Sequence, residues 1–384
     1  MEQFELIVPT LFGIEAVTAK EIRALGYEVI RTEDGRVTFL GDAMAVCRAN
    51  LWLRTGERVL IKIGEFRATT FEELFEKNKQ LPWEKWITKH VAFPIKGFTL
   101  KSTLFSVSDC QSILKKSIVE RLKQKYHVDW FDEQGATYQI QFSIIKDQVT
   151  MMLDTSGAGL HKRGYRLKSN DAPLRETVAA ALLQLSVWHE NRPFADPFCG
   201  SGTFPVEAAL MAINRAPGLN RVFAGEKFSQ VDRNLWKQAK EEAKDLIRKD
   251  SKPMIFGYDV DPACVSLSKE NALRAGVEDL VSIQLRDVCG FRQEEEYGVI
   301  VCNPPYGERL GDLKDARRLY KIMGRQFQTC PTWSQYILTS DEEFEQFYGK
   351  KADKKRKIYN GMIKCDCYQY FGPKPPYRRD VHES

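Results

Sequence analysis

Short apolar runs and longer helical stretches alternate along the first part of the chain. The runs 4–8 and 36–40 have the length and composition of β-strands, and Asp-Gly at 34–35 predicts a tight hairpin turn before the second run. Between the two runs, the apolar positions of 14–25 recur at helical spacing. This order of strand, helix and hairpin predicts a small α+β unit, ferredoxin-like in outline, over residues 1–43.

A second unit is expected at 44–155, and it contains a helix with two contrasting faces. Apolar residues recur on one face of 111–125, and the other positions carry lysine and arginine against a single acid, Glu120. Basic faces of this kind are most often solvated, but they also suit contact with a phosphate backbone. The residues assigned to that contact are Lys115, Lys116 and Lys123.

The rest of the chain, 161–384, has the pattern of a parallel sheet whose strands alternate with helices. The apolar runs 280–286 and 297–302 are typical of buried strands, and the strand predicted at 253–261 leads directly into a helix. Asp261 is the expected N-cap of that helix. A series of strand–helix units predicts a doubly wound α/β domain.

The C-terminal part predicts an antiparallel edge for this sheet. The run 334–339 has the pattern of a strand, and 357–370 has that of a hairpin around Asn-Gly at 360–361. Antiparallel pairing at one edge of a mostly parallel sheet is common. The lysine-rich run 350–357 is expected to form an exposed loop before the hairpin, with contact to RNA phosphates as the alternative.

A loop of small residues joins a short strand to a helix in this half. The sequence from Asp196 to Thr203 is Asp-Pro-Phe-Cys-Gly-Ser-Gly-Thr, and a helix is expected from Thr203 to about residue 214. Small residues let a ligand lie against the backbone, and a helix N-terminus favours a negative group such as a carboxylate. The loop is not a dinucleotide fingerprint, because Pro205 occupies the place of the third glycine.

Acidic residues follow the next two strands and suit a nucleoside ligand. Asp259, at the tip of its strand, is placed to accept both ribose hydroxyls, as acids do in other doubly wound folds. Asp287, which precedes Val288, can accept from the adenine amino group, with a solvated carboxylate at a strand end as the alternative. The spacing between the glycine loop and Asp259 is longer than in a dinucleotide-binding fold, and residues 215–252 account for the excess. The charged helical pattern of these residues predicts an inserted helix outside the ligand pocket.

The most informative stretch is Asn-Pro-Pro-Tyr, directly after a predicted buried strand. The side-chain oxygen of Asn303 and the carbonyl of Pro304 are two acceptors, and because neither Pro304 nor Pro305 has an N–H, the corner is rigid. Tyr306 adds a flat ring. Two acceptors and a ring suit the exocyclic amino group of a nucleobase, since the acceptors hold its hydrogens while the ring stacks on the base.

Composition agrees with this picture and narrows the class of protein. The chain has 384 residues, of which 43% are hydrophobic and 28% charged, and a net charge of +5 is compatible with a nucleic-acid partner. No apolar run approaches the roughly 18 residues of a membrane span, and the first residues do not resemble a signal peptide. Nine cysteines without repeated pair spacing indicate reduced thiols in the cytoplasm. Neither the pair Cys365 and Cys367 nor the scattered histidines predict a metal site.

The motifs together resemble those of a known family. The stretch 101–115 resembles the signature of a THUMP domain, an RNA-binding module of RNA-modifying enzymes. The loop 196–203 resembles the first motif of class I S-adenosylmethionine-dependent methyltransferases, and Asn-Pro-Pro-Tyr-Gly-Glu-Arg at 303–309 completes the set. Practically the whole chain resembles the bacterial THUMP-containing 23S rRNA guanine-N2 methyltransferases.

This resemblance implies a fold, a cofactor and a set of site residues. The implied fold is α/β, with a Rossmann-like class I methyltransferase sheet preceded by a ferredoxin-like unit and a THUMP domain. The implied cofactor is S-adenosylmethionine, and the residues assigned to it are Asp196, Phe198, Cys199, Gly200, Ser201, Gly202, Thr203, Asp259, Asp287 and Val288. The residues assigned to catalysis are Asn303, Pro304, Pro305 and Tyr306.

The segment after residue 160 resembles the part that, in this family, enters the catalytic domain and closes one side of the cofactor pocket. Arg163, Tyr165 and Arg166 combine positive charge with an aromatic ring, a pattern suited to single-stranded RNA. Asp171 is expected to cap a helix that has Pro173 in its first turn.

The expected reaction is methyl transfer to the N2 amine of guanine in RNA, most simply 23S rRNA, by a cytoplasmic monomer that has no metal or membrane partner. Unlike the fused two-domain enzymes of some proteobacteria, the chain is expected to carry only this activity. Three alternatives stay open. They are an adenine-N6 methyltransferase acting on RNA or DNA, a tRNA guanine-N2 methyltransferase, and an RNA-binding ribosome-assembly factor whose catalytic half is inert.

Overall fold

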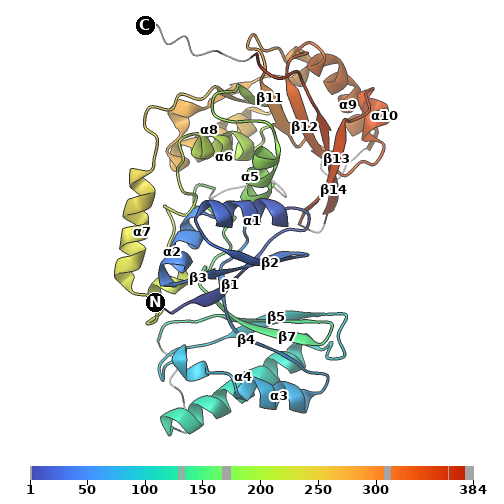
Figure 1. Cartoon of the computed structure of the whole chain (residues 1–384). Coiled ribbons are helices and arrows are strands. Elements are labelled where there is room, and N and C mark those ends of the chain that lie inside the picture. Colours follow the sequence, from blue (N-terminus) through green and yellow to red (C-terminus); the bar gives the residue numbers. More distant parts are fainter. Residues whose placement is uncertain are drawn as a thin grey trace. The chain divides into compact units, whose positions relative to one another are not determined.

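The computed structural model describes residues 2–128, 131, 135–166, 174–306, 313–361 and 363–376. The chain folds into two compact units (Figure 1). Unit 1 contains residues 1–10, 18–160 and 218–243, and unit 2 contains residues 11–17, 161–217 and 244–384. Each unit is built on one seven-stranded sheet.

The sheet of unit 1 begins with a ferredoxin-like half. Its strands are β1 (Phe4–Pro9), β2 (Val29–Glu33), β3 (Arg36–Gly41) and β4 (Leu60–Arg67), and its helices are α1 (Glu15–Ala24) and α2 (Ala43–Trp52). The strand order is β2-β3-β1-β4, and every pairing is antiparallel. This order confirms the ferredoxin-like prediction.

The second half of unit 1 extends the same sheet. β4 pairs with β1 through only two residues, but it pairs along its length with β7 (Gln148–Asp154), beyond which lie β6 (Ile140–Ile145) and β5 (Ile95–Leu100). The remaining elements are α3 (Phe71–Lys79), η1 (Trp83–Lys85) and α4 (Val107–Tyr126). Side chains of α3 and α4 share one hydrophobic core with β6 and β7, so these helices pack on one face of the sheet. The basic helix predicted at 111–125 is α4.

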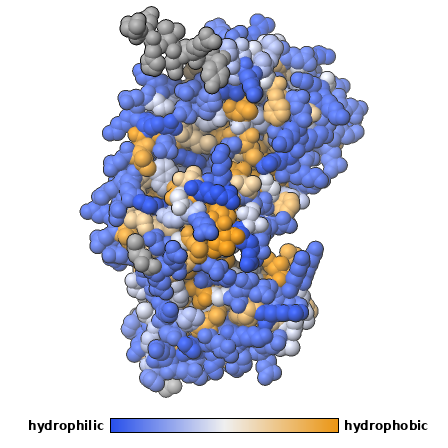
Figure 2. Space-filling view, in the orientation of Figure 1, coloured by the Kyte–Doolittle hydropathy of each residue, from blue (hydrophilic) through white to orange (hydrophobic). Residues whose placement is uncertain are grey.

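β5 forms the outer edge of the sheet, and alternate residues along it face opposite ways. Ile95 is buried in the core, whereas Lys96, Phe98 and Leu100 are exposed on the other face. Hydrophobic colour reaches the surface on this side of the unit, within a face of the molecule that is mostly hydrophilic (Figure 2).

Residues 218–243 are inserted between two elements of unit 2 and pack into unit 1. They contain η2 (Ala224–Lys227) and most of α7 (Arg233–Asp245). The rings of Phe223 and Trp236 lie in the core of unit 1, stacked with their centroids 5.3 Å apart. Arg48 of α2 donates two hydrogen bonds, of 2.9 and 3.0 Å, to Glu242. The predicted inserted helix is therefore confirmed, and its place in the core of unit 1 is a feature that the sequence did not indicate.

Unit 2 contains the predicted, mostly parallel sheet. Its strands are β8 (Phe194–Asp196), β9 (Ile255–Asp259), β10 (Ser282–Leu285), β11 (Val299–Cys302), β12 (Ser334–Thr339), β13 (Lys354–Asn360) and β14 (Ile363–Tyr370). Their order is β10-β9-β8-β11-β12-β14-β13, parallel from β10 to β12 and antiparallel at the last two strands. This is the strand order expected of a class I methyltransferase, and the predicted edge hairpin is present.

Helices cover both faces of this sheet (Figure 1). α5 (Glu176–Leu185), α6 (Thr203–Ala212) and α8 (Pro262–Ala275) contribute to one hydrophobic cluster, and α9 (Leu313–Phe327) and α10 (Phe344–Tyr348) contribute to a second. Two short helices, η3 (Glu278–Leu280) and η4 (Val288–Gly290), flank β10. Every residue of β11 and β12 is buried, as expected of strands that are covered on both faces.

Two expectations about secondary structure need comment. The lysine-rich run 350–357 is not a loop throughout, because β13 begins at Lys354 and pairs from there with β14. Those lysines alternate along a strand, where side chains of successive residues face opposite ways. The helix cap expected at Asp171 and Pro173 lies outside the described residues, and the described helix, α5, begins at Glu176.

We predict that Trp236→Ala destabilises unit 1 by about 3–5 kcal/mol, the range for removing a large buried aromatic side chain. Trp236 is 2% exposed and stacks on Phe223, so its loss leaves a cavity in the core. Chemical denaturation followed by fluorescence and circular dichroism measures the effect. Lys237→Ala, on the exposed side of the same helix, is the control, and equal stability of the two variants would show that the inserted helix does not anchor the core.

Candidate active site

The carboxyl ends of four parallel strands meet around one cavity in unit 2, which we name the strand-end pocket. Its volume is about 560 Å³, and its lining residues are Pro197, Phe198, Gly200, Asp259, Val260, Asp261, Cys264, Arg286, Asp287, Val288, Asn303, Pro305, Asp315, Arg318, Leu319 and Ile322. β8 lies between β9 and β11, so the connections from this point run to opposite sides of the sheet. Ligands of doubly wound sheets bind at such a switch point.

The glycine loop after β8 is held in a conformation that leaves room for a ligand. Gly200 and Gly202 have φ values of 54° and 80°, a region that glycine adopts without strain. The N–H of Cys199 donates to the carbonyl of Tyr258 at 2.8 Å, which ties the loop to β9. Apart from its chain neighbours, no atom of the described residues lies within 4 Å of the place that a Cβ of Gly200 would take, so the backbone there is open to a ligand.

Asp259, at the end of β9, lines the strand-end pocket and fixes the glycine loop. Its carboxylate accepts hydrogen bonds from the N–H of Gly200 at 2.8 Å and from the N–H of Asp261 at 3.0 Å. Asp261 itself caps α8 by accepting from Ala263 N–H at 2.8 Å, so its own role as a cap is confirmed. A carboxylate oxygen has more than one lone pair, so Asp259 keeps acceptor capacity for ribose hydroxyls.

Asp196 is a buried acid that has no cationic partner among the described side chains. It is 1% exposed, and one of its oxygens accepts from the N–H of Phe198 at 3.0 Å. Burial raises the pKa of Asp196 well above its usual value, and the negative charge of Asp259 adds to this. The carboxyl group of Asp196 therefore holds its proton more readily than an exposed aspartate does.

Asp287, at the end of β10, differs from Asp196 in its surroundings. It is exposed, and it accepts a hydrogen bond of 2.7 Å from the N–H of Cys289. This hydrogen bond lowers the pKa of Asp287, so its carboxylate is ionised near neutral pH. An ionised acceptor at this edge of the pocket suits an amino group of a base.

The Asn-Pro-Pro-Tyr corner brings one unsatisfied acceptor to the pocket. The Oδ1 atom of Asn303 is buried and accepts no hydrogen bond from any residue in the described part of the chain. A buried acceptor without a donor costs about 1–3 kcal/mol, so a ligand that donates to it gains free energy. The hydroxyl of Tyr320 donates to the carbonyl of Pro305 at 3.4 Å and also contacts Thr339, which fixes the corner from behind.

The four corner residues differ in their access to the pocket. Asn303 and Pro305 line it, whereas Pro304 and Tyr306 are buried and are not among its lining residues. Tyr306 is 4% exposed, so its ring offers no open face in this structure. Stacking of a base on Tyr306 stays a prediction. The residues after it, 307–312, lie outside the described ranges.

The predicted cofactor residues also divide into two groups. Phe198, Gly200, Asp259, Asp287 and Val288 line the pocket. Those placed behind the lining, in buried positions of the loop and the start of α6, are Asp196, Cys199, Ser201, Gly202 and Thr203. The residues of the second group fix the shape of the loop but do not line the pocket.

Two polar residues of α8 that hold the glycine loop were missed by the sequence interpretation. The hydroxyl of Ser268 donates to the carbonyl of Gly200 at 2.7 Å, and the side-chain amide of Asn271 donates to the carbonyl of Ser201 at 2.9 Å. Both are fully buried. Polar residues three positions apart on the buried face of a helix are the signal that marks them. Arg318, Leu319 and Ile322 of α9, which also line the pocket, carry no such signal.

The structure gives Arg163 and Tyr165 a different place from the one predicted. Both are buried, and both contact Glu207 of α6, at 3.4 Å from Arg163 Nε and 3.2 Å from the hydroxyl of Tyr165. Arg166 pairs with Glu176 at 2.6 Å and lies 3.3 Å from the hydroxyl of Thr203. In this structure the buried pair presents no surface to single-stranded RNA, because its polar atoms face the inside of unit 2.

The three lysines assigned to RNA contact on α4 are not equivalent. Lys115 is half-buried, with Nζ 3.2 Å from the carbonyl of Phe93 and 3.5 Å from the centroid of its ring. Lys116 is exposed and Lys123 is half-buried. Only part of the predicted basic face is therefore open to solvent.

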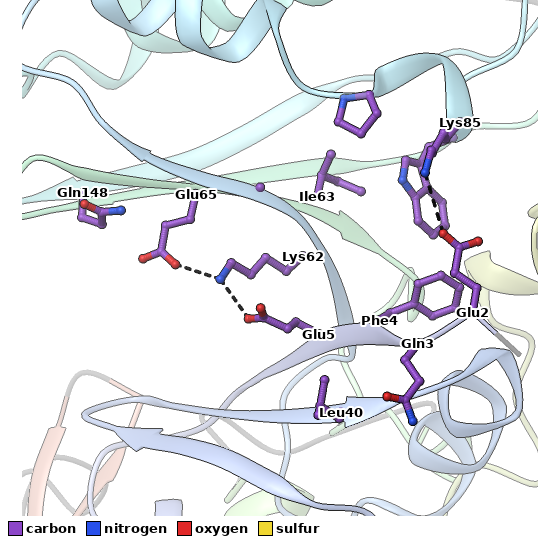
Figure 3. Close-up of a pocket in the computed structure, with 13 residues that line it drawn as sticks. Glu2, Gln3, Phe4, Glu5, Leu40, Lys62, Ile63, Glu65, Lys85 and Gln148 are labelled. Carbon is purple, nitrogen blue, oxygen red and sulfur yellow. Dashed lines mark hydrogen bonds and ion pairs between the residues drawn. The ribbon is translucent and has the colours of Figure 1, made fainter.

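A second hollow lies in unit 1, where β1 and β4 diverge (Figure 3). Its volume is about 720 Å³. Lys62 forms salt bridges with Glu5 at 2.9 Å and with Glu65 at 2.8 Å, and Figure 3 shows both as dashed lines. Because these charges pair with one another, the hollow is a gap in the sheet that salt bridges span. It lacks acceptors at the ends of parallel strands like those that line the strand-end pocket of unit 2.

Two kinds of feature are not found in the described ranges. No group of three or more histidine, cysteine, aspartate or glutamate residues there is arranged to hold a metal ion. No helix there is both long enough and apolar enough to cross a membrane.

We predict that Asp196→Asn stabilises the ligand-free protein at pH 8 by on the order of 1 kcal/mol, which raises the melting temperature of a unit this size by about 2–4 °C. A carboxyl group whose pKa is raised by folding contributes stability below its ordinary pKa near 3.8, and that contribution is lost as the pH rises. The amide retains an acceptor for Phe198 N–H. Calorimetry at several pH values should show the gain shrinking towards pH 4.

Asp250→Asn, an exposed acid in the same unit, is the control and should change stability little at any pH. A loss of stability in Asp196→Asn that is the same at pH 4 and pH 8 would contradict the account of Asp196.

Comparison with known protein families matches three models to consecutive parts of the chain. Residues 5–60 match the RlmL ferredoxin-like domain and residues 68–154 match the THUMP domain. Residues 163–369, more than half of the chain, match the RMKL-like methyltransferase domain. These are the fold types predicted from the sequence.

Curated relatives carry names of RNA methyltransferases. A protein of Bacillus subtilis (strain 168) named "Putative RNA methyltransferase YpsC" is 50% identical over 386 residues, covering 100% of both chains. The "Ribosomal RNA large subunit methyltransferase K/L" of Hahella chejuensis is 32% identical over 98% of this chain. The match covers 54% of that relative, so the chain spans about half the length of the K/L enzymes.

Solved structures agree over the whole fold. A protein of Listeria monocytogenes described as "a predicted N6-adenine-specific DNA methylase" is 50% identical, with a TM-score of 0.92 over 97% of each chain. SMU.472, described as "a putative methyltransferase complexed with SAH", is 43% identical, with a TM-score of 0.92 over 98% of this chain and 100% of the other. The family models, the relatives and the strand-end pocket agree, and the chain belongs to the RMKL-like family of S-adenosylmethionine-dependent RNA methyltransferases.

Proposed function

We propose that this protein methylates the exocyclic N2 amine of a guanine in 23S rRNA. The observation that carries the proposal is the buried, unsatisfied Oδ1 of Asn303 at the edge of the strand-end pocket. An acceptor in that state binds an N–H donor, and an exocyclic amine carries two such hydrogens. The carbonyl of Pro304 is proposed for the second hydrogen.

The acceptors at the corner do more than hold the base. By accepting the amine hydrogens, Asn303 and Pro304 turn the nitrogen lone pair out of conjugation with the ring and towards the pocket. The site's main tasks are alignment and exclusion of water, because a positively charged sulfur already activates the methyl group that S-adenosylmethionine supplies when bound. No strong base is required.

The step proposed is a direct displacement. Attack by the N2 lone pair forms the new N–C bond as the electron pair of the C–S bond goes to sulfur, and the nitrogen then releases a proton to water. The buried corner keeps the amine in line with the methyl carbon. Tyr320, whose pKa burial raises to about 12, stays protonated and can keep donating to the Pro305 carbonyl.

The residues around the pocket fit the parts of the cofactor. We propose that Asp259 accepts the ribose hydroxyls and that Asp287, with Val288, contacts the adenine amino group and ring. Gly200 and Gly202 let the methionine part lie against the backbone, where the start of α6 favours its carboxylate.

The choice of RNA rests on the names of the relatives, and the choice of guanine N2 rests on the family resemblance of the sequence motifs. The K/L enzymes are named for the large-subunit ribosomal RNA, and the B. subtilis relative is named for RNA. The Listeria structure is named for adenine N6 in DNA, and the same corner accepts either amine. Adenine-N6 methylation is therefore the second candidate, and tRNA guanine-N2 methylation is the third. Nine free cysteines agree with the proposed cytoplasmic setting.

We predict that Asn303→Ala lowers the rate of methyl transfer by roughly 10²–10³-fold, the scale for losing one preorganised polar group. Affinity for S-adenosylmethionine should change little, since the variant removes an acceptor for the base. Single-turnover kinetics on RNA and calorimetric titration with S-adenosylmethionine measure the two quantities. Asn234→Ala, on the exposed side of α7, is the control, and a wild-type rate for Asn303→Ala would remove the corner from the mechanism.

The identity of the product decides among the candidates. Mass spectrometry of nucleosides from the rRNA and tRNA of a strain that lacks the gene should show the loss of N2-methylguanosine from one site in 23S rRNA. Loss of N6-methyladenosine, or loss of N2-methylguanosine from tRNA alone, would replace the proposal by one of its alternatives. If calorimetry shows no binding of S-adenosylmethionine, the catalytic half is inert and the protein acts by binding RNA.

A further inference from the structure

A series of hydrogen bonds runs behind the Asn-Pro-Pro-Tyr corner, from the end of β12 to the carbonyl of Pro305. The N–H of Asp341 donates to the hydroxyl of Thr339 at 3.2 Å. The hydroxyls of Thr339 and Tyr320 lie 3.1 Å apart, and Tyr320 donates to the carbonyl of Pro305 at 3.4 Å. We name these four residues, Asp341, Thr339, Tyr320 and Pro305, the Tyr320 relay.

The two ends of the Tyr320 relay fix the direction of every hydrogen bond in it. A carbonyl can only accept, so the single hydroxyl hydrogen of Tyr320 points at Pro305. The contact between the two hydroxyls is therefore a donation from Thr339 to Tyr320. Thr339 in turn accepts from the N–H of Asp341, which can only donate. Hydrogen bonds that share one direction polarise one another, so the relay holds the corner more firmly than Tyr320 alone would.

Both hydroxyl side chains of the relay lie inside unit 2. Tyr320 and Thr339 are fully buried, and the ring of Tyr320 packs edge-on against Phe344, with 4.8 Å between the ring centroids. Burial strengthens each of these hydrogen bonds, because water does not compete for the same atoms. The hydroxyl of Tyr320 therefore has a fixed position behind the corner.

The far end of the relay is anchored as well. Arg317 donates to both carboxylate oxygens of Asp341, at 3.1 and 3.3 Å, and the hydroxyl of Tyr368 donates to the carbonyl of Asp341 at 3.2 Å. Arg317 and Tyr320 lie three positions apart on α9. One helix thus provides the cation that holds the start of the relay and the hydroxyl that holds its end.

The carbonyl of Pro305 is one residue away from the carbonyl of Pro304, which the proposed function assigns to the amine. The proline rings fix φ at both residues, so little freedom is left between the two carbonyls. A hydrogen bond that holds the carbonyl of Pro305 therefore also limits the direction of the carbonyl of Pro304.

From this geometry we infer that Tyr320 is a positioning residue for methyl transfer, which acts through Pro305 to keep the carbonyl of Pro304 directed at the amine. The inference rests on the proposed function in taking the Asn-Pro-Pro-Tyr corner as the place where the amine is held. Tyr320 itself is not among the residues that line the strand-end pocket, so its effect on the reaction passes through the corner.

The kinetic test uses the full-length protein, S-adenosylmethionine and RNA extracted from a strain that lacks the gene. Tyr320→Phe removes only the hydroxyl, and kcat should fall about tenfold because the amine is held less well in line with the methyl group. The KM for S-adenosylmethionine should change by less than about twofold. Thr339→Val, which removes the donor behind Tyr320, should lower kcat by a smaller factor, about threefold.

Tyr336→Phe is the matched control. Tyr336 is 1% exposed in the same unit, and its hydroxyl accepts from the N–H of Val187, a residue outside the corner. Burial raises the pKa of Tyr336 and of Tyr320 to about 12, so both hydroxyls keep their hydrogen. Each Phe variant loses a buried hydroxyl, and both should lower the melting temperature by a similar amount, about 2–4 °C. Only Tyr320→Phe should lower kcat.

A double variant shows whether Tyr320 acts through the corner. In the Asn303→Ala background the amine has already lost one of its two proposed acceptors, so the direction of the other acceptor matters less. Adding Tyr320→Phe should then lower kcat by less than about twofold. A tenfold loss in both backgrounds would show that the two residues act independently, and it would overturn the inference.

The remaining outcomes separate this inference from the proposed function. If Tyr320→Phe keeps the wild-type kcat while Asn303→Ala is slow, the inference is wrong and the proposed corner stands. If Asn303→Ala is as fast as the wild type, the corner does not hold the amine, and both proposals are wrong. An equal fall of kcat in Tyr336→Phe would assign the loss to the stability of unit 2 and would also overturn the inference.

Discussion

Unit 2 buries a polar acceptor that no donor of the described residues satisfies, and the proposed function depends on this constraint. Asn303 Oδ1 has no donor among the described residues, and Asp196, which accepts from Phe198 N–H, has no cationic partner there. Such groups reduce stability in the free protein, since a buried acceptor without a partner costs about 1–3 kcal/mol. Sites that are arranged for a ligand commonly carry this kind of cost. In the proposed function, the ligand that relieves this cost at Asn303 is an exocyclic amine.

The sheet of unit 2 is what brings these acceptors to one place. The parallel order β10-β9-β8-β11 sets the ends of four strands side by side, and each end contributes one polar residue. The hydrogen bond from Gly200 N–H to Asp259 then couples the glycine loop to the neighbouring strand. Ser268 and Asn271 hold the same loop from behind. The pocket is therefore shaped mainly by backbone groups and their partners.

Much of the fold and of the strand-end pocket could be predicted from the sequence, because helix starts and buried strands leave local patterns in it. Asp261 before Pro262 predicts a helix start, and the apolar run before Asn303 predicts a buried strand. The sequence does not show which turn of a distant helix faces a loop, so Ser268, Asn271 and the α9 residues were missed. For the same reason Arg163 and Tyr165 were assigned to RNA, although their partner Glu207 lies on α6 and buries them. The packing of Trp236 into the core of unit 1 is equally non-local.

A crystal structure of the protein with S-adenosylhomocysteine and a short RNA that contains the target guanine tests the central claim most directly. The account predicts that the guanine N2 lies about 3 Å from Asn303 Oδ1, a normal hydrogen-bond distance, and points at the sulfur across the strand-end pocket. A guanine whose N2 faces away from Asn303, or a base bound outside the strand-end pocket, would contradict it.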